Sequence, residues 1–258
     1  MKLIYEVKDK VAYITINRPE AMNAMDPEVY EGISRAWVDV RDNPDVWVAI
    51  VTGAGQKAFT AGADLKSMSK RVPPEKADFW LTQKDMLLNR GLEVWKPVIA
   101  AVNGYCLAGG MTLLFGTDIR IAAEHAVFEI SEVKRGILPG NGGTQRALRQ
   151  LPYAVAMELL LLGRRLTAQE ALSYGLINKV VPMAELMPSA EQCARQLCEN
   201  GPLALRAIKE LAIRSQSLPL EQGIRLEQSV QEFLRTTEDA KEGPRAFAEK
   251  RKPTYKAR

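Results

Sequence analysis

One uncharged segment constrains the fold of this chain more than any other feature: residues 97–117 carry no charged side chain. An apolar helix of this length could span a bilayer. The segment begins with a proline, however, and it contains Asn103 and four glycines. A buried strand, a tight glycine turn and a short buried helix explain this pattern better. We therefore predict no transmembrane segment and no membrane partner.

Other apolar runs predict the sheet to which such a buried strand belongs. Residues 3–7 and 11–16 form a hairpin pattern around Asp9-Lys10. Residues 46–52 are a continuous run rich in β-branched side chains, which is typical of a strand buried on both faces. We predict further buried strands over residues 98–102 and 119–122, and another strand over 177–181.

Helical signals surround and follow these strands. Asp26 and Pro27 predict a helix start that continues to about residue 41, and residues 167–170 form a capping box for a helix that stops at Gly175. Beyond residue 183 only helical periodicity remains, with expected breaks at Gly201-Pro202, Pro219 and Gly243-Pro244. We predict an α/β core over residues 1–195 and a C-terminal helical region over 196–258. Because helices depend on burying an apolar face, this region should pack on its own core or on a neighbouring subunit.

Composition restricts the classes of ligand. The chain has 35 Lys and Arg against 31 Asp and Glu, a net charge of +4. This excess suits an anionic ligand and does not indicate nucleic acid. Three cysteines, an odd number, and an N-terminus that runs straight into a strand pattern predict a reducing, cytoplasmic location. A single histidine, His125, without a close pair of cysteines predicts no metal site.

Two segments of small residues directly follow buried strands. They are residues 58–66 and 103–110. Small residues at a strand-to-helix junction leave backbone N–H groups free, and two such donors on one carbonyl oxygen form an oxyanion hole. The alternative, that the glycines only permit close packing, stays open for either segment alone. Neither residues 104–110 nor 140–145 complete a phosphate-loop or dinucleotide motif, because the required Lys-Ser/Thr and the final glycine are missing.

A third segment of interest, residues 128–146, contains Glu132 and the run Gly140-Asn141-Gly142-Gly143. Together with the first two segments it belongs to a set of motifs spread over nearly the whole chain. These are Asn17-Arg18-Pro19 with Met22-Asn23-Ala24, residues 103–110, 131–137 and 139–146, Leu162-Gly163 with residues 168–175, and residues 242–251. In this order they resemble the crotonase (enoyl-CoA hydratase/isomerase) superfamily. The resemblance implies an α/β spiral of ββα units with a C-terminal helical region used for oligomerisation, as a homotrimer or homohexamer.

The resemblance also implies the residues of the site. The backbone N–H groups of Ala63 and Gly109 would hold the thioester carbonyl of an acyl-CoA, and Glu132 would be the catalytic acid/base. Coenzyme A is then part of the substrate, and no separate cofactor is implied. The residues implied to bind the coenzyme A ester are Ala61, Ala63, Asp64, Leu65, Lys66, Gly109 and Lys250.

One departure from the family pattern concerns the reaction. Hydratases of the family carry two glutamates; the second matches Glu132, but the first matches Thr112, whose hydroxyl is too weak a base to replace a carboxylate. A single carboxylate is sufficient to move a proton between two carbons of a dienolate. We therefore favour double-bond isomerisation slightly, with hydration or dehydration of an enoyl-CoA as the alternative. A non-catalytic acyl-CoA-binding or RNA-binding protein is a remote third, and no basic stripe interleaved with aromatic residues supports RNA.

Three other carboxylates are candidates to replace the missing glutamate. Glu129 lies three residues before Glu132, and in an extended segment this odd spacing places the two side chains on opposite faces. Capping or hydrogen bonding explains Asp64 and Asp118 adequately. The acyl group stays open: the apolar residues Phe79, Trp80, Met86, Leu87 and Trp95 either wall an acyl pocket for an apolar or cyclic group or belong to the core.

Overall fold

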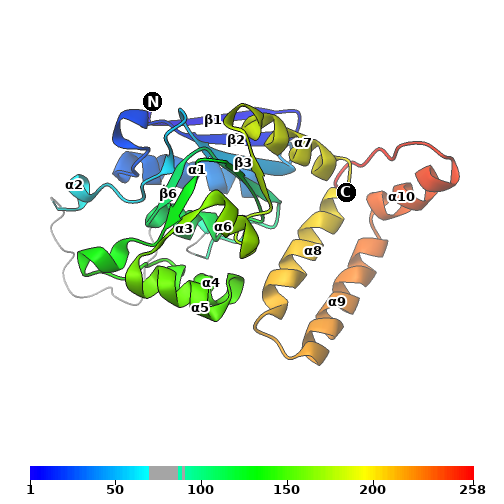
Figure 1. Cartoon of the computed structure of the whole chain (residues 1–258). Helices are drawn as coiled ribbons and strands as arrows, with labels where there is room; N and C mark the ends of the chain where they lie inside the picture. The colour runs from blue at the N-terminus through cyan, green and yellow to red at the C-terminus, as the bar shows by residue number, and fades with distance from the viewer. Residues whose placement is uncertain (70–86, 89–90) are drawn as a thin grey trace.

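Two β-sheets form the centre of the protein in the computed structural model, which describes residues 1–69, 87–88 and 91–258 (Figure 1). The larger sheet contains β1 (Leu3–Lys8), β2 (Val11–Ile16), β3 (Val48–Gly53), β5 (Val98–Val102), β7 (Ile119–Ala123) and β10 (Lys179–Val181), in that spatial order. The smaller sheet contains β4 (Ala58–Thr60), β6 (Tyr105–Leu107), β8 (Val127–Glu129) and β9 (Arg165–Thr167), also in that order. All strands that the sequence predicts are present in the larger sheet. The short strands of the smaller sheet are an addition to that prediction.

The chain passes repeatedly from the larger sheet to the smaller one. β3 leads to β4, β5 to β6 and β7 to β8, and each of these pairs is followed by a helical turn: α2 (Leu65–Met68), α3 (Gly109–Leu114) or the 3₁₀ turn η4 (Glu132–Arg135). β3, β5 and β7 pair in parallel, and so do β4, β6 and β8. This is the predicted spiral of ββα units. Because the carboxyl ends of parallel strands meet at one edge of a sheet, the three helical turns are brought together there.

The uncharged segment 97–117 forms a strand, a turn and a short helix, as predicted. β5 is fully buried, and the turn after it is held by Asn103, whose amide donates to the carbonyls of Gly53 and Gly55 at 2.8 Å. A Cβ on Gly104 would lie 2.2 Å from the Lys57 carbonyl oxygen, so only glycine fits this turn. Within the described residues, no helix is long and apolar enough to cross a membrane.

Two predicted helix starts are confirmed by their caps. Asp26 accepts a hydrogen bond from the Val29 N–H (3.0 Å) at the start of α1 (Pro27–Asp42), which packs on β1 and β2. Thr167 and Glu170 form the capping box of α6 (Ala168–Ser173). Between η4 and α6 lie three further helical segments: α4 (Gly143–Gln150), α5 (Tyr153–Met157) and the π-helix η5 (Glu158–Leu162). Two short 3₁₀ turns are η1 (Pro19–Ala21), before α1, and η6 (Met183–Glu185), after β10.

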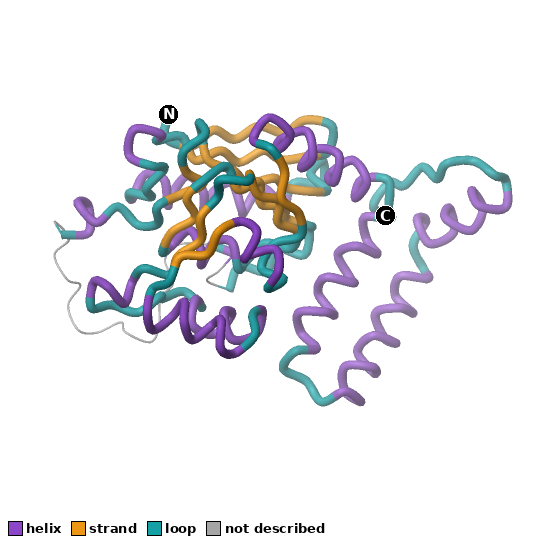
Figure 2. The backbone as a smooth tube through the Cα atoms, viewed as in Figure 1, coloured by secondary structure: helices purple, strands orange, loops and turns teal. Residues whose placement is uncertain are grey.

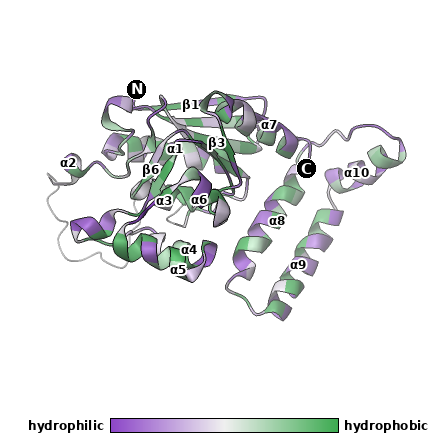
Figure 3. Ribbon diagram, viewed as in Figure 1, coloured by the Kyte–Doolittle hydropathy of each residue, from purple (hydrophilic) through white to green (hydrophobic). Residues whose placement is uncertain are grey.

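The C-terminal part is helical, as predicted. α7 (Leu186–Cys198) packs on β3, β5 and β7, whereas α8 (Pro202–Ser215), α9 (Leu220–Arg235) and α10 (Glu238–Ala248) extend away from both sheets (Figure 2). Apolar side chains recur along α8 and α9 (Figure 3), and several are exposed, among them Ile208, Ile224 and Phe233. The boundary predicted at residue 195 lies inside α7, and the division into two parts stays a prediction.

One predicted helix break is wrong. Gly243-Pro244 lies inside α10, although the proline has no N–H to donate within the helix. The carboxylate of Glu242 accepts hydrogen bonds from Arg251 (2.6 and 3.0 Å) and from the Thr254 N–H (2.9 Å). These contacts tie the following chain back onto α10 and stabilise the helix despite the proline.

Candidate active site

A hollow of about 730 Å³ lies where β4, β6 and β8 end. Its walls come from the segments that directly follow these three strands, together with Met22 and Met25 between β2 and α1 and Tyr30 of α1. The parallel order of the strands explains this convergence, since it places three distant segments of the sequence at one edge. The residues of the hollow that the sequence predicts are Ala61, Ala63, Asp64, Leu65, Lys66, Gly109 and Glu132.

The Ala63 N–H faces away from the neighbouring segment that contains Met25. Met25 and Ala63 form an isolated parallel bridge, in which the Met25 N–H donates to the Gly62 carbonyl (2.8 Å) and the Asp64 N–H donates to the Met25 carbonyl (3.0 Å). In such a bridge the central residue directs its own N–H to the opposite side. Among the described residues nothing accepts a hydrogen bond from the Ala63 N–H. It is therefore available to a ligand.

Gly109 supplies a second N–H beside the first. It is the first residue of α3, so its N–H has no partner within the helix. A Cβ on Gly109 would lie 3.3 Å from the Ala63 nitrogen, and a Cβ on Gly62 would lie 2.5 Å from the Gly109 nitrogen. The two predicted donors are thus close together; glycine is needed at residue 62 for this approach, and a Cβ at residue 109 would make it tight.

The residue before Gly109 is in a strained conformation. Ala108 has φ +49° and ψ −115°, a region that residues with a Cβ rarely adopt. Its own N–H donates to the Glu129 carbonyl (2.9 Å), which holds the turn in place. Backbone strain of this kind is found preferentially where a site requires a fixed orientation. Here it orients the start of α3 and with it the Gly109 N–H.

Glu132 begins the turn η4 and faces the same hollow. Its side chain is buried, with a relative exposure of 8 %, and within the described part of the chain its Oε2 has no hydrogen-bond partner. Burial raises the pKa of Glu132, and the negative charge of Glu129 adds to this, while its own backbone N–H and Arg135 act in the opposite direction. A buried carboxylate with a raised pKa and a free oxygen is suited to accept and return a proton.

Thr112 lies in the wall of the hollow, at the position where the family pattern has its first glutamate. It is buried on α3, and its Oγ1 donates to the Gly109 carbonyl at 2.9 Å. This is a local helix contact, and a hydroxyl at this position has no acid/base capacity near neutral pH. The structure therefore places no carboxylate at this point of the described wall.

Glu129 lies outside the hollow. Its carboxylate accepts hydrogen bonds from Lys134 Nζ (2.8 Å) and Arg165 Nε (2.6 Å). Burial alone would raise the pKa of Glu129, but these two donors outweigh it, and the pKa is lowered. The separation from Glu132 that the odd spacing predicts is present, and Glu129 does not serve as a second carboxylate in the hollow.

The acidic residue of the first segment has a structural role. Asp64 caps α2 by accepting the Lys66 and Ser67 N–H groups, and it forms an ion pair with Arg18 at 3.0 Å. Sequence reasoning assigned no role to Arg18, although Asn17-Arg18-Pro19 was among the motifs. The guanidinium also donates to the Ala24 carbonyl (2.6 Å), so it ties the loop before α1 to the first segment. Asp118 likewise accepts the Val98 N–H and pairs with Lys209.

Lys250 is not brought to the hollow within this chain. It is exposed, has φ +54° and follows α10, which Figure 1 shows at the opposite end of the molecule from α2. Of the residues predicted for an acyl pocket, Phe79, Trp80 and Met86 lie outside the described residues. Leu87 is buried in the core, and Trp95 lies under the Arg214 guanidinium of α8, at 5.2 Å from its ring centroid.

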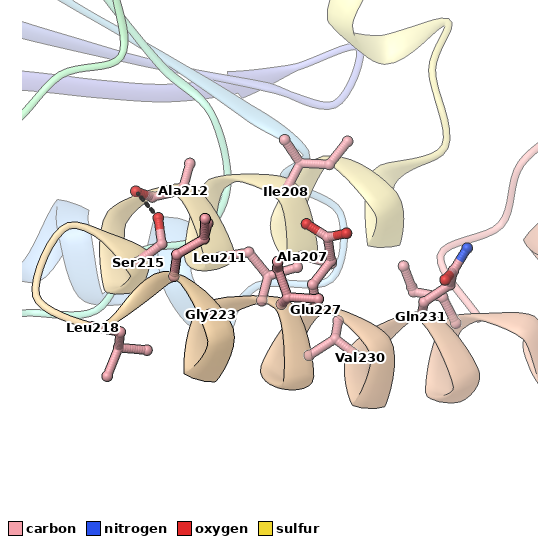
Figure 4. A pocket seen from close by; sticks show the side chains of 13 residues that line it. Ala207, Ile208, Leu211, Ala212, Ser215, Leu218, Gly223, Glu227, Val230 and Gln231 are labelled. Carbon is pink, nitrogen blue, oxygen red and sulfur yellow. Dashed lines mark hydrogen bonds between the residues drawn. The ribbon is translucent and has the colours of Figure 1, made fainter.

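A second hollow, of about 780 Å³, lies between α8 and α9 (Figure 4). Its walls are mostly apolar and include Ala207, Leu211 and Val230, with Glu227 as the one charged side chain in its lining. This hollow has the character of a packing surface rather than of a reaction site. In the described residues, no group of three or more His, Cys, Asp or Glu side chains is arranged to hold a metal ion.

Comparison with known proteins identifies relatives of the whole chain. Residues 6–258 match the family model described as "Enoyl-CoA hydratase/isomerase". The chain is 42% identical over 258 residues to an (E)-benzylidenesuccinyl-CoA hydratase from Thauera aromatica, covering 99% of each sequence. It is 42% identical over 249 residues to a carnitinyl-CoA dehydratase from Salmonella enteritidis, covering 95% of this chain and 94% of the relative.

Solved structures agree with this assignment. An enoyl-CoA hydratase from Bacillus anthracis superimposes with a TM-score of 0.92 at 35% identity and covers 100% of both chains. An enoyl-CoA hydratase from Mycobacterium tuberculosis superimposes with a TM-score of 0.89, also at 35% identity, covering 100% of this chain and 99% of the other. The predicted fold class is confirmed by these similarities over the full length of the chain.

Proposed function

The chain belongs to the enoyl-CoA hydratase/isomerase family of crotonase-type enzymes, and from this premise we propose that Glu132 transfers a proton on an acyl-CoA thioester held by Ala63 and Gly109. One observation carries the proposal. Glu132, whose buried Oε2 has no hydrogen-bond partner, lines the same hollow as two backbone N–H groups that also lack partners among the described residues.

The two N–H groups would bind the thioester carbonyl oxygen. When a proton leaves the α-carbon, negative charge develops on this oxygen, and the donors stabilise the resulting enolate. One preorganised donor of this type contributes about 3 kcal/mol to transition-state stabilisation. Coenzyme A enters as part of the substrate, and the proton transfer needs no separate cofactor.

Shift of a carbon–carbon double bond is the reaction that a single carboxylate serves most directly. Glu132 takes a proton from C2 of a 3-enoyl-CoA, the electrons move into the thioester as a dienolate, and the same carboxyl group returns the proton to C4. The product is a 2-enoyl-CoA with no change in atoms. Thr112 in the wall of the hollow supports this choice, because it stands where the family pattern has its first glutamate.

Hydration or dehydration is the second candidate, and the relatives favour it. The two curated relatives at 42% identity are named a hydratase and a dehydratase. For hydration Glu132 would have to accept a proton from water and deliver one to the α-carbon, without help from residue 112. This requirement predicts that hydration is the slower of the two reactions.

We also propose a homotrimer or homohexamer. The exposed apolar side chains of α8 and α9 and the apolar hollow between them provide a surface for self-association. In such an assembly Lys250 of another copy would be available to the phosphates of coenzyme A, whereas the Lys250 of the same chain does not line the hollow. A monomeric mass by light scattering at micromolar concentration would contradict this.

A paired assay tests the proposed function. The purified protein is given a 3-enoyl-CoA and a trans-2-enoyl-CoA, and Glu132→Gln is measured beside it. Double-bond shift that exceeds hydration and is lost in the variant supports the isomerase. Rapid hydration with little shift supports the second candidate, whereas binding of both thioesters without turnover contradicts both and leaves a binding protein.

A further inference from the structure

Glu129 is a buried charged residue for which the proposed proton transfer has no use. Its relative exposure is 3 %, and it is the last residue of β8. It touches both of the turns that form the site, one through its backbone and the other through its side chain. These contacts suggest a role that is separate from catalysis and can be tested separately.

The backbone contact is to the turn that precedes Gly109. The Glu129 carbonyl accepts a hydrogen bond from the Ala108 N–H at 2.9 Å. Ala108 is the strained residue with φ +49°, and its orientation determines where the next N–H points. A movement of the end of β8 would therefore be transmitted directly to one of the two proposed thioester-binding groups.

The side-chain contact is to the turn that carries Glu132. Glu129 Oε1 accepts a hydrogen bond from Lys134 Nζ at 2.8 Å, and Lys134 belongs to η4 together with Glu132. The same ammonium donates to the Gly163 carbonyl at 2.6 Å. Gly163 has φ +58°, and a Cβ there would lie 2.7 Å from Lys134 Cε, so the lysine crosses a position that only glycine leaves open.

A third element fixes the carboxylate itself. Arg165 on β9 stands opposite Glu129 in the β8–β9 pairing, and its Nε donates to Oε2 at 2.6 Å. The two carboxylate oxygens are thus held from two directions, by η4 and by β9. With both oxygens occupied, the side chain has little freedom to move.

We propose that Glu129 is a positioning residue, which holds the turn of Ala108 and Gly109 and the turn of Glu132 at a fixed mutual position. The expected effect on kcat rests on the proposed function, whereas the fixed position of the two turns does not depend on it. Glu129 does not line the hollow, so it acts through its neighbours and not on the substrate. Displacement of reacting groups by about 1 Å is enough to cost about 10²-fold in rate.

The charges around the two glutamates give the inference a second readout. Lys134 and Arg165 face Glu129, while Arg135 and Glu129 are the charged groups that act on Glu132. Replacing Glu129 by glutamine removes a negative charge and leaves two cations without their partner. The loss of the negative charge and the unpairing of the two cations both favour the ionised form of Glu132. We therefore expect the pKa of Glu132 to fall.

The experiment compares Glu129→Gln, Lys134→Met and the double variant with wild type. The matched control is Glu158→Gln, which removes an exposed carboxylate that pairs with Arg164 and not with Glu129, Lys134 or Arg165. We measure kcat and KM on the preferred thioester, the stability of each variant, and the titration of the Glu132 carboxyl by ¹³C NMR, assigned through Glu132→Gln. The NMR titration requires folded protein but no turnover.

We expect each single variant to lower kcat by about 10- to 100-fold with KM changed less than about threefold. The Glu132 titration should shift to lower pH in Glu129→Gln, and the double variant should be no worse than the worse single one, because both act through one contact. The inference is overturned if Glu129→Gln keeps the kcat of wild type, whatever happens to the Glu132 titration, and differs in function from wild type no more than the control does. If Glu129→Gln does not fold, Lys134→Met decides by the same kinetic criterion.

The two proposals can fail independently. If wild type turns over no thioester, the proposed function fails, and the NMR titration of Glu132 still decides whether Glu129 acts on its turn. If wild type is active and the Glu129 and Lys134 variants are as active, the positioning role fails alone.

Discussion

Glu129 and Glu132 are three residues apart, both buried, and yet they differ in almost every property that matters for chemistry. Glu129 ends a strand and has a cation on each oxygen, so its pKa is lowered. Glu132 begins a turn and has a free oxygen, so its pKa is raised. Burial alone would raise the pKa of both carboxylates. The hydrogen-bond donors that reach each one decide whether its pKa ends above or below the ordinary value.

This difference distinguishes a carboxylate that stabilises the fold from one that is available for proton transfer. A carboxylate whose hydrogen-bonding capacity is satisfied by the protein stabilises the fold and is unavailable to a substrate. A carboxylate left without a partner costs stability and gains the capacity to exchange a proton. The turn between Glu129 and Glu132 thus joins the held end of a strand to the side chain that we propose as the acid/base, over a few residues.

The largest expected effect comes from adding a carboxylate at residue 112. Thr112→Glu would place a second acid/base group in the wall of the hollow, and we expect hydration of a 2-enoyl-CoA to rise by about 10²-fold relative to double-bond shift. Thr112→Gln, of the same size but without charge, is the control and should not raise hydration. An unchanged ratio of the two reactions in Thr112→Glu would show that residue 112 does not decide between them.

A smaller effect is expected from removing the carboxylate of Glu129, both oxygens of which accept hydrogen bonds from cations. Glu129→Gln should lower the free energy of unfolding by about 1–2 kcal/mol near neutral pH, because its two cations are surface-accessible enough to be rehydrated. The pKa of Glu129 is lowered by folding, so this stabilisation is present above the ordinary glutamate pKa and is lost as pH falls through the lowered value. Urea unfolding over a pH series measures it; a difference that persists at the most acidic pH would contradict an electrostatic origin.

The smallest effect has the opposite sign. Glu132→Gln should raise the free energy of unfolding by up to about 1 kcal/mol near neutral pH, since it removes a buried charge whose Oε2 has no hydrogen-bond partner among the described residues. The pKa of Glu132 is raised by folding, so the gain should vanish as pH falls through that raised value and wild type becomes neutral there too. Equal stability of the two proteins at neutral pH would mean that Glu132 is better solvated than its burial indicates.

Much of the fold followed from local pattern. The observed element was predicted correctly from the uncharged segment, from the β-branched run of β3 and from the caps at Asp26 and Thr167. Buried strands and helix caps require particular residue types at neighbouring positions, so they can be recognised in the sequence. The smaller sheet could not be predicted from local pattern, because β4, β6, β8 and β9 have only three residues each and their partner strands are distant in sequence. The continuation of α10 through Pro244 depends on contacts of Glu242 with the C-terminal segment, which no local pattern contains.

The site was predictable in part for the same reason. The position of Ala63 beside Gly109 was implied by resemblance, and the geometry shows why both need small neighbours. The roles of Arg18 and Lys134 were not predicted, since each depends on residues brought close only by folding: Asp64 for the first and Glu129 for the second.

The central claim is that Glu132 transfers a proton at the α-carbon of a bound thioester. The most direct measurement is exchange of the α-hydrogens of a saturated acyl-CoA in D₂O, followed by NMR, because this substrate can be neither hydrated nor isomerised. We predict exchange catalysed by wild type and by Thr112→Gln, and none above background with Glu132→Gln. Exchange by Glu132→Gln at the wild-type rate would contradict the claim and assign the proton transfer to another group.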